Sequence, residues 1–155
     1  MELRSVEELM DLLHACRGTR GTACPGAPAD LHDHALQTAA LLRRSRPADK
    51  ELQVAGLVHV IGQLLRPGDL TGRGACAAAA VGPLLGTRVS RLVRLHGQDR
   101  TPGPVPDDQA MEDVLALRHA DESARTAGLD AGVLEDWRTV LELVSSRHAR
   151  LGAVD

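Results

Sequence analysis

Residues 51–65 read ELQVAGLVHVIGQLL, and this stretch decides the fold of the protein. Its apolar residues recur at the spacing of an α-helix, which predicts one helix that Pro47 opens and that ends at residues 66–68. Another helix is expected just before it, from the cap residue Asp30 to Arg44. Because both helices carry extended apolar faces, we expect them to form the buried centre of the protein.

Helical patterns also occupy most of the remaining chain. A capping box of Ser5 and Glu8 predicts a first helix that continues to about Cys16. Four further helices are expected at about residues 74–85, 87–96, 108–127 and 133–150, with Gly128 capping the third of them. The Gly- and Pro-rich segments 17–29 and 97–108 are predicted loops, and the second is a candidate pocket rim. The sequence therefore predicts a single all-α domain over residues 1–155, a bundle of about six to seven helices.

The composition excludes several classes of function. The 155 residues include one Trp and no Phe or Tyr, so Leu, Val and Ala must fill the core. A net charge of −3 does not indicate the basic surface of a nucleic-acid-binding protein. Arg88, Arg91 and Arg94, at helical spacing, are interpreted as a solvated helix face. No apolar run approaches the roughly 20 residues of a membrane span, and we expect a soluble, cytoplasmic protein. The three cysteines are expected to be free thiols, and Cys24 is the only one considered for a reactive role.

The seven histidines provide the candidate site. Three of them lie in apolar helical context, where an imidazole needs a partner, and with one carboxylate they could converge from facing helices: His34, His59, His96 and Asp121. The alternative is that these are separate core histidines, each with its own partner. Surface or cap positions are expected for His32, His119 and His148, and His14 fits a helix C-terminus.

Four stretches resemble the pattern of the HD superfamily. HDHALQTA at residues 32–39 is similar to the family's helix with its first metal-binding His, and residues 51–65 resemble its signature helix, which reads roughly L-L-H-D-I-G-H-L-L. Downstream, VGPLLGTRVSRLVRLH at residues 81–96 and LRHADESAR at residues 117–125 resemble the helices that supply a later His and the last Asp. The resemblance covers about residues 26–126 and is nearest to small HD phosphohydrolases and organophosphonate-cleaving diiron oxygenases. It implies an HD-like helical bundle with metal chemistry on a small molecule.

The resemblance carries over to some ligand positions and fails at others. The positions that match the family's ligands are His34, His59, His96 and Asp121. The signature Asp, however, falls on Val60, a further His falls on Gln63, and another falls near Arg73 or Gly74. A dinuclear centre is therefore not expected. The remaining His34, His59 and Asp121 have the composition of a two-His-one-carboxylate site for a single iron or manganese ion. The alternative is a pocket without metal that uses its imidazoles for acid–base catalysis.

Substrate-binding residues are expected beside these ligands. Arg100 and Arg125 match positions where the family places basic residues, and either could hold a phosphate or carboxylate. For Arg125 the alternative is an ion pair with Asp121 or Glu122 on its own helix. Gln37 and Gln63 complete the candidate set. The loop before residue 30 lacks the aromatic and acidic residues that the phosphonate oxygenases keep there, so that reaction is disfavoured.

Three functions remain open at this point. The first is a diverged HD enzyme that acts on a small biosynthetic, phosphorylated or carboxylated intermediate through acid–base or single-metal chemistry. The second is a non-catalytic HD module that binds a ligand or regulates a partner, and the third is a mononuclear iron oxygenase. The expected partner is a small molecule rather than nucleic acid or a membrane, and a homodimer is left open.

Overall fold

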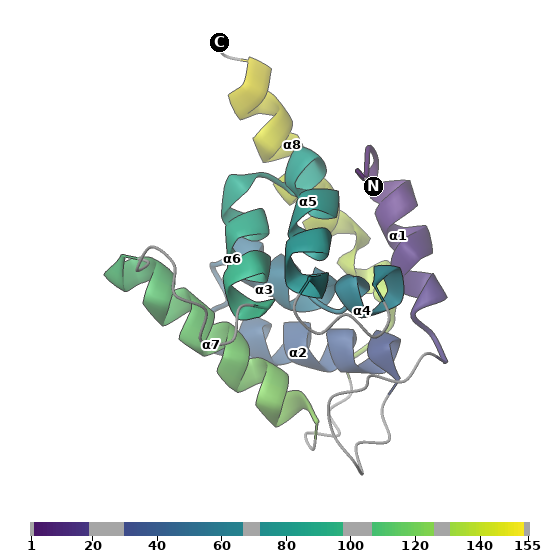
Figure 1. Cartoon of the computed structure of the whole chain (residues 1–155), viewed down its shortest axis with the longest axis vertical. Coiled ribbons are helices and arrows are strands. Elements are labelled where there is room, and N and C mark those ends of the chain that lie inside the picture. The colour runs from purple at the N-terminus through teal and green to yellow at the C-terminus, as the bar shows by residue number, and fades with distance from the viewer. Residues whose placement is uncertain (1, 19–29, 67–71, 98–106, 126–130, 154–155) are drawn as a thin grey trace.

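The prediction of an all-α fold is confirmed. The structure, a computed structural model, describes residues 2–18, 30–66, 72–97, 107–125 and 131–153. Within these ranges the chain forms only helices (Figure 1). They are α1 Val6–Ala15, α2 Leu31–Ser45, α3 Lys50–Val58, α4 Ile61–Leu65, α5 Arg73–Leu85, α6 Thr87–Gly97, α7 Asp108–Ala124, the 3-10 helix η1 Leu134–Trp137 and α8 Arg138–Ala153.

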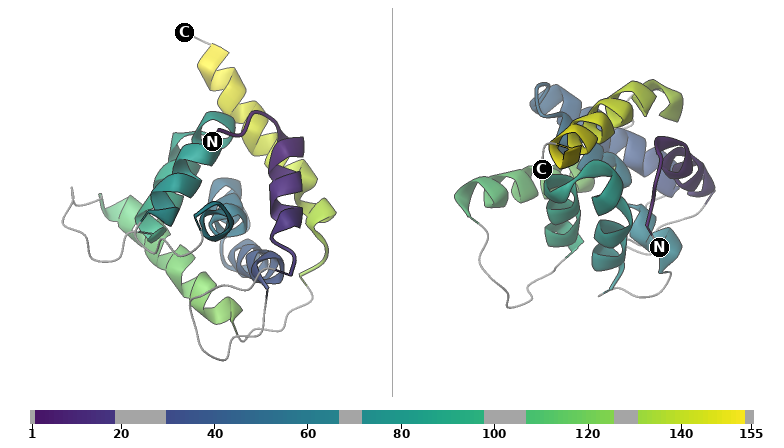
Figure 2. Two further views of the ribbon diagram at one scale, coloured as in Figure 1. Left: turned by 45° about the vertical axis from the view of Figure 1, so that its right-hand side comes forward. Right: turned by 90° about the horizontal axis from the view of Figure 1, so that it is seen from above.

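Helix α3 lies at the centre of the bundle. Every residue from Leu52 to Val58 is buried, and α3 contacts α2, α6, α7 and α8. In the left view of Figure 2, α2, α3 and α4 lie between the α5–α6 pair and the α1–α8 side of the molecule. The expectation that the second and third predicted helices form the buried centre is therefore correct. Leu, Val and Ala side chains make up most of the core, together with the single Trp137.

The predicted third helix is not continuous. It begins later than expected, at Lys50, where the carboxylate of Asp49 accepts a hydrogen bond from Leu52 N at 3.1 Å, and it stops at Val58. His59 caps this end, and α4 starts two residues later. The ring Nδ1 of His59 donates to the Gly56 carbonyl at 2.6 Å, an oxygen that the amide of residue 60 would use in a continued helix. The break therefore lies at the position that resembles the family signature.

The helix starts agree with the capping pattern of the sequence. Ser5 Oγ accepts from Glu8 N at 3.2 Å, and Asp30 Oδ1 accepts from Asp33 N at 2.8 Å, as expected for the caps of α1 and α2. Asp107 caps α7 by accepting from Ala110 N at 2.7 Å. The C-terminal end differs from the prediction, because α7 ends at Ala124, and Gly128 lies outside the described residues.

The interpretation of Arg88, Arg91 and Arg94 as a solvated face is wrong for Arg88. Its guanidinium donates to both carboxylate oxygens of Asp49 at 2.7 Å and to Asp113 Oδ2 at 3.0 Å. Asp49 caps α3, and Asp113 is a buried residue of α7. Arg88 thus joins α6 to α3 and α7, the three helices whose ends carry His96, His59 and Asp121.

A close approach of two backbones fixes the end of α6. A Cβ placed on Gly97 would lie 2.7 Å from the Cα of Gly74 at the start of α5, and a Cβ on Gly74 would lie 2.8 Å from the Cα of Gly97. Because the obstacle is backbone, it cannot move aside as a flexible side chain would. Only glycine therefore fits at either position.

We expect Gly97→Ala to destabilise the protein by about 1–3 kcal/mol, because the overpacked backbones must separate. Urea unfolding followed by circular dichroism measures this change. Gly82→Ala is the matched control within α5, since a Cβ there meets only the Ser90 side chain, at 3.3 Å. A Gly97→Ala variant as stable as Gly82→Ala would contradict the close packing.

Two further expectations concern the membrane and the thiols. No helix among the described residues is long and apolar enough to cross a lipid bilayer. Cys16 and Cys76 are free, as expected. Burial, together with the charge of Asp30, raises the pKa of the Cys16 thiol to about 11, so this thiol stays protonated and unreactive at neutral pH. Cys24 lies outside the described residues.

Candidate metal centre

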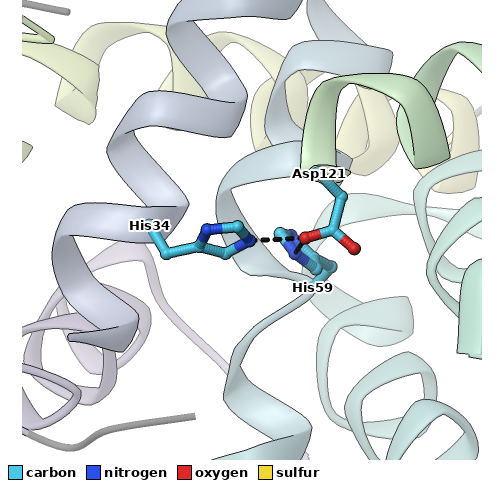
Figure 3. A group of neighbouring side chains, drawn as sticks. All are labelled: His34, His59 and Asp121. Atoms are coloured by element: carbon cyan, nitrogen blue, oxygen red, sulfur yellow. Dashed lines mark hydrogen bonds and ion pairs between the residues drawn. The ribbon is translucent and has the colours of Figure 1, made fainter. Parts of the chain in front are cut away.

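The structure brings together the four residues that the sequence singles out. His34 comes from the first turns of α2, His59 from the end of α3, His96 from the end of α6 and Asp121 from the last turn of α7. His34 Nε2 is hydrogen-bonded to Asp121 Oδ1, and His59 Nε2 lies 3.3 Å from the same oxygen. His96 Nε2 lies 3.1 Å from the other oxygen, Oδ2. Figure 3 shows the rings of His34 and His59 directed at the Asp121 carboxylate.

The cluster is largely buried and strongly polar. The side-chain exposure is 5% for His59 and 17% for Asp121, with His34 and His96 between them. Burial by itself raises the pKa of Asp121, but hydrogen bonds from the three histidines hold that pKa far below its ordinary value. The carboxylate is therefore ionised at any working pH. Four polar side chains at one buried point are costly unless something compensates them.

The hydrogen bond of the His59 ring determines which of its nitrogens carries a proton. Nδ1 lies 2.6 Å from the Gly56 carbonyl oxygen, which can only accept, so Nδ1 must be the donor. In the neutral ring the lone pair is then on Nε2, which faces Asp121 Oδ1, another group with only lone pairs. Two acceptors at 3.3 Å repel each other unless a proton or a cation lies between them. Histidines that bind metals characteristically donate their other nitrogen in this way.

Three potential ligand atoms of the cluster lie close enough together to share a single divalent ion. His34, His59 and Asp121 each offer one ligand atom, and these atoms all lie within 4.8 Å of one another. Two ligands about 2.1 Å from a tetrahedral ion are about 3.4 Å apart, close to the separation of His59 Nε2 from Asp121 Oδ1. Two imidazoles and a carboxylate form a common ligand set for divalent transition metals. His96 contacts Asp121 Oδ2, and both His34 and His59 face Oδ1.

Val60 and Gln63 occupy positions where the resemblance to the HD superfamily predicts metal ligands. Val60 is completely buried and belongs to the apolar core, so it offers no ligand atom for a second ion beside His59. Gln63 is half-buried on α4, and its Oε1 has no hydrogen-bond partner within the part of the chain that the structure describes.

The other candidate substrate-binding residues lie on the helices of the site or outside the described ranges. Gln37 and Arg125 are half-buried. Gln37 follows His34 by three residues, and Arg125 follows Asp121 by four, so each lies on the same side of its helix as the site residue before it. Arg125 forms the C-terminal cap of α7. Arg100 lies outside the described residues.

The expectation of a surface or cap position is wrong for His32. Its side chain is only 6% exposed, because Asp30 caps α2 and leaves His32 facing inward in the first turn. The ring stacks on His14 at the end of α1, with 6.0 Å between the ring centroids. His119 is exposed, as expected, and His148 is half-buried against Gly86.

Sequence reasoning also missed the role of Gly56. Its carbonyl fixes the proton on His59, and a Cβ at Gly56 would lie 2.6 Å from Leu42 Cδ1. The sequence signal that could have indicated this role was a glycine three residues before a histidine in an apolar helix.

A scan against models of known protein families and a search of the curated proteins find no match for this chain.

Proposed function

We propose that this protein is a diverged HD-superfamily enzyme that acts on a small molecule with one divalent metal ion, iron or manganese. Its protein ligands are His34, His59 and Asp121. The observation that carries the proposal is the convergence of His34, His59 and Asp121, whose ligand atoms lie within 4.8 Å of one another while His59 Nδ1 donates to the Gly56 carbonyl. The order of the ligands along the chain, with His59 at the end of a central buried helix, supports descent from the HD superfamily.

Each residue of the site has a separate task. Asp121 supplies the negative charge that offsets the cation, and its ionised state is secured by the surrounding histidines. His96 holds Asp121 Oδ2 and fixes the orientation of the carboxylate. Its Nδ1 is buried and has no hydrogen-bond partner among the described residues, so it is available to exchange a proton with a substrate. When bound, the metal would act as a Lewis acid that polarises a substrate oxygen.

One ion rather than two is proposed because of Val60. A second ion needs an anionic ligand beside His59, and this position is an aliphatic side chain packed in the core. Without that ligand the charge of two adjacent dications would be poorly offset. Phosphoester hydrolysis of the two-metal type is therefore not proposed.

The substrate class follows from the basic and amide groups near the ligands. Arg125 lies one turn beyond Asp121 and carries a guanidinium group that suits a phosphate or carboxylate, and Arg100 follows the end of α6 in the sequence. Gln37 and Gln63 add amide groups, and the unpartnered Oε1 of Gln63 is an acceptor for a substrate hydroxyl or amine. A small phosphorylated or carboxylated intermediate fits these groups.

Elemental analysis of protein purified without chelator tests the proposal. We expect about one equivalent of iron or manganese in the wild type and its loss in His59→Ala, because that change removes a direct ligand. His119→Ala is the matched control, since His119 is an exposed residue on α7. A wild type without metal, or a His59→Ala variant that keeps it, overturns the proposal and favours metal-free acid–base catalysis or a non-catalytic binding module.

The ligand composition also favours a mononuclear iron oxygenase as a second candidate. Two histidines and one carboxylate are the ligand set of that class, and they leave positions open for substrate and oxygen. Iron as the bound metal and oxygen consumption with substrate are expected from this candidate. Full activity under argon contradicts it.

A further inference from the structure

A second group of potential ligands lies at the start of α2. Asp30, His32 and Asp33 each offer one ligand atom, and these atoms lie within 4.8 Å of one another. His32 Nδ1 is directed at this group and lies 3.6 Å from Asp33 Oδ1. The Asp33 side chain is 67% exposed, whereas that of His32 is 6% exposed. The group thus combines a buried imidazole with an opening to solvent.

The imidazole of His32 lacks the partners that a buried polar group needs. Within the described residues, neither Nδ1 nor Nε2 makes a hydrogen bond, although the ring is more than nine-tenths buried. Buried polar atoms without partners are rare, and each one points to a water, an ion or a ligand that completes the site. Because Nδ1 faces Asp33 beyond hydrogen-bonding distance, a cation between them accounts for both groups.

Asp30 caps α2, but its carboxylate oxygens still have lone pairs that can bind a cation. Oδ1 accepts from Asp33 N at 2.8 Å, and Oδ2 accepts from Gly18 N at 3.0 Å. Each carboxylate oxygen has a second lone pair, so both remain able to bind a cation. The helix N-terminus carries about half a positive charge, which the two carboxylates outweigh. The local charge therefore attracts a cation despite the helix dipole.

This group is separate from the His59 centre. His32 and His34 are two residues apart on α2, and side chains at this spacing point to nearly opposite faces of a helix. His34 is directed at Asp121, whereas His32 stacks on His14 of α1. The two sites share a helix but no ligand.

We propose that Asp30, His32 and Asp33 form a second, independent binding site for a divalent cation of the zinc class. One imidazole nitrogen and two carboxylate oxygens suit Zn²⁺, and they leave at least one position for water. The bound ion would satisfy Nδ1 of the buried His32 ring and join three residues at the start of α2. Because these are only three ligands, partly open to solvent, the ion should exchange with the medium.

Calorimetric titration of Zn²⁺ into chelator-treated His59→Ala tests this site without the first one. We expect one equivalent of Zn²⁺ to bind, and EDTA to remove it. Binding should be lost in His59→Ala/His32→Gln and weakened at least tenfold in His59→Ala/Asp33→Asn. Asp33 is exposed, so its replacement leaves the core intact. His59→Ala/His119→Ala is the matched control and should bind as His59→Ala does.

Two results overturn this site: no Zn²⁺ binding by folded His59→Ala, or unchanged binding in both double variants. If His59→Ala does not fold, the wild type and His32→Gln give the same separation. Wild type should then bind one equivalent more than His32→Gln, and equal stoichiometry overturns the proposal. Loss of iron or manganese from the His59 centre has no bearing on either result, because the two sites share no ligand.

Discussion

Asp121→Asn should remove the metal ion proposed for this protein and, with it, the metal's contribution to stability. The amide has nearly the shape of the carboxylate but no charge to offset a dication, and its nitrogen cannot act as a ligand. A metal present at about 100 times its dissociation constant stabilises the folded state by about 2.7 kcal/mol. We therefore expect EDTA to lower the unfolding free energy of the wild type by about this amount and to leave Asp121→Asn unchanged.

Urea unfolding with and without EDTA measures this effect, and elemental analysis confirms the metal content. Glu122→Gln is the matched control, because it removes a charge at the next position of α7, where the side chain is exposed. Its response to EDTA should equal that of the wild type. If the wild type does not respond to EDTA, or if Asp121→Asn responds as strongly, Asp121 is not a metal ligand.

Arg88→Met should destabilise the protein strongly, because it removes an ion pair that joins three helices. The variant keeps the apolar part of the side chain but leaves Asp113, which is 3% exposed, without its closest cation. Removing one partner of a buried ion pair costs about 3 kcal/mol or more. A loss of unfolding free energy near about 3 kcal/mol is expected here. Gln109 Nε2 still donates to Asp113 at 3.1 Å, and Arg46 lies 3.7 Å from Asp113. Thermal or urea unfolding measures the loss.

The effect of Arg88→Met should depend on pH. The hydrogen bonds from Arg88 lower the pKa of Asp49 below its ordinary value of 3.8. A carboxyl group with a lowered pKa stabilises the folded state above that ordinary value, and the contribution disappears as pH falls through the folded pKa. The stability difference between wild type and Arg88→Met is therefore largest near neutral pH and shrinks below about pH 4.

Arg91→Met on the same helix is the control for Arg88→Met. Arg91 is 43% exposed and lies 3.8 Å from Asp107, itself 68% exposed. Surface pairs of this kind contribute about 0–1 kcal/mol. Equal effects of the two substitutions would show that Arg88 does not join α6 to α3 and α7.

The sequence was sufficient for most helices and failed at two local features. Caps at Ser5 and Asp30 and the apolar periodicity located α1 and α2, since these signals are local to each helix. The break after Val58 was not predicted, because it depends on a side-chain hydrogen bond from His59 to the Gly56 carbonyl. Arg88 was misassigned for a related reason. Its helical spacing resembles a solvated face, and its partners come from residues 39 positions before it and 25 after it.

What the sequence alone determined is the helical content, the buried centre and the identities of His34, His59, His96 and Asp121. Helical periodicity shows which residues face inward, but it says nothing of where two helices meet. Only the tertiary structure decided that these four side chains share one point, and that His59 Nε2 faces Asp121 Oδ1 at 3.3 Å. It also decided that His32 is buried beside Asp30 and Asp33. The physical reason is that ligand geometry depends on contacts between helices, such as Arg88 with Asp113 and Gly74 with Gly97, which join residues far apart in the chain.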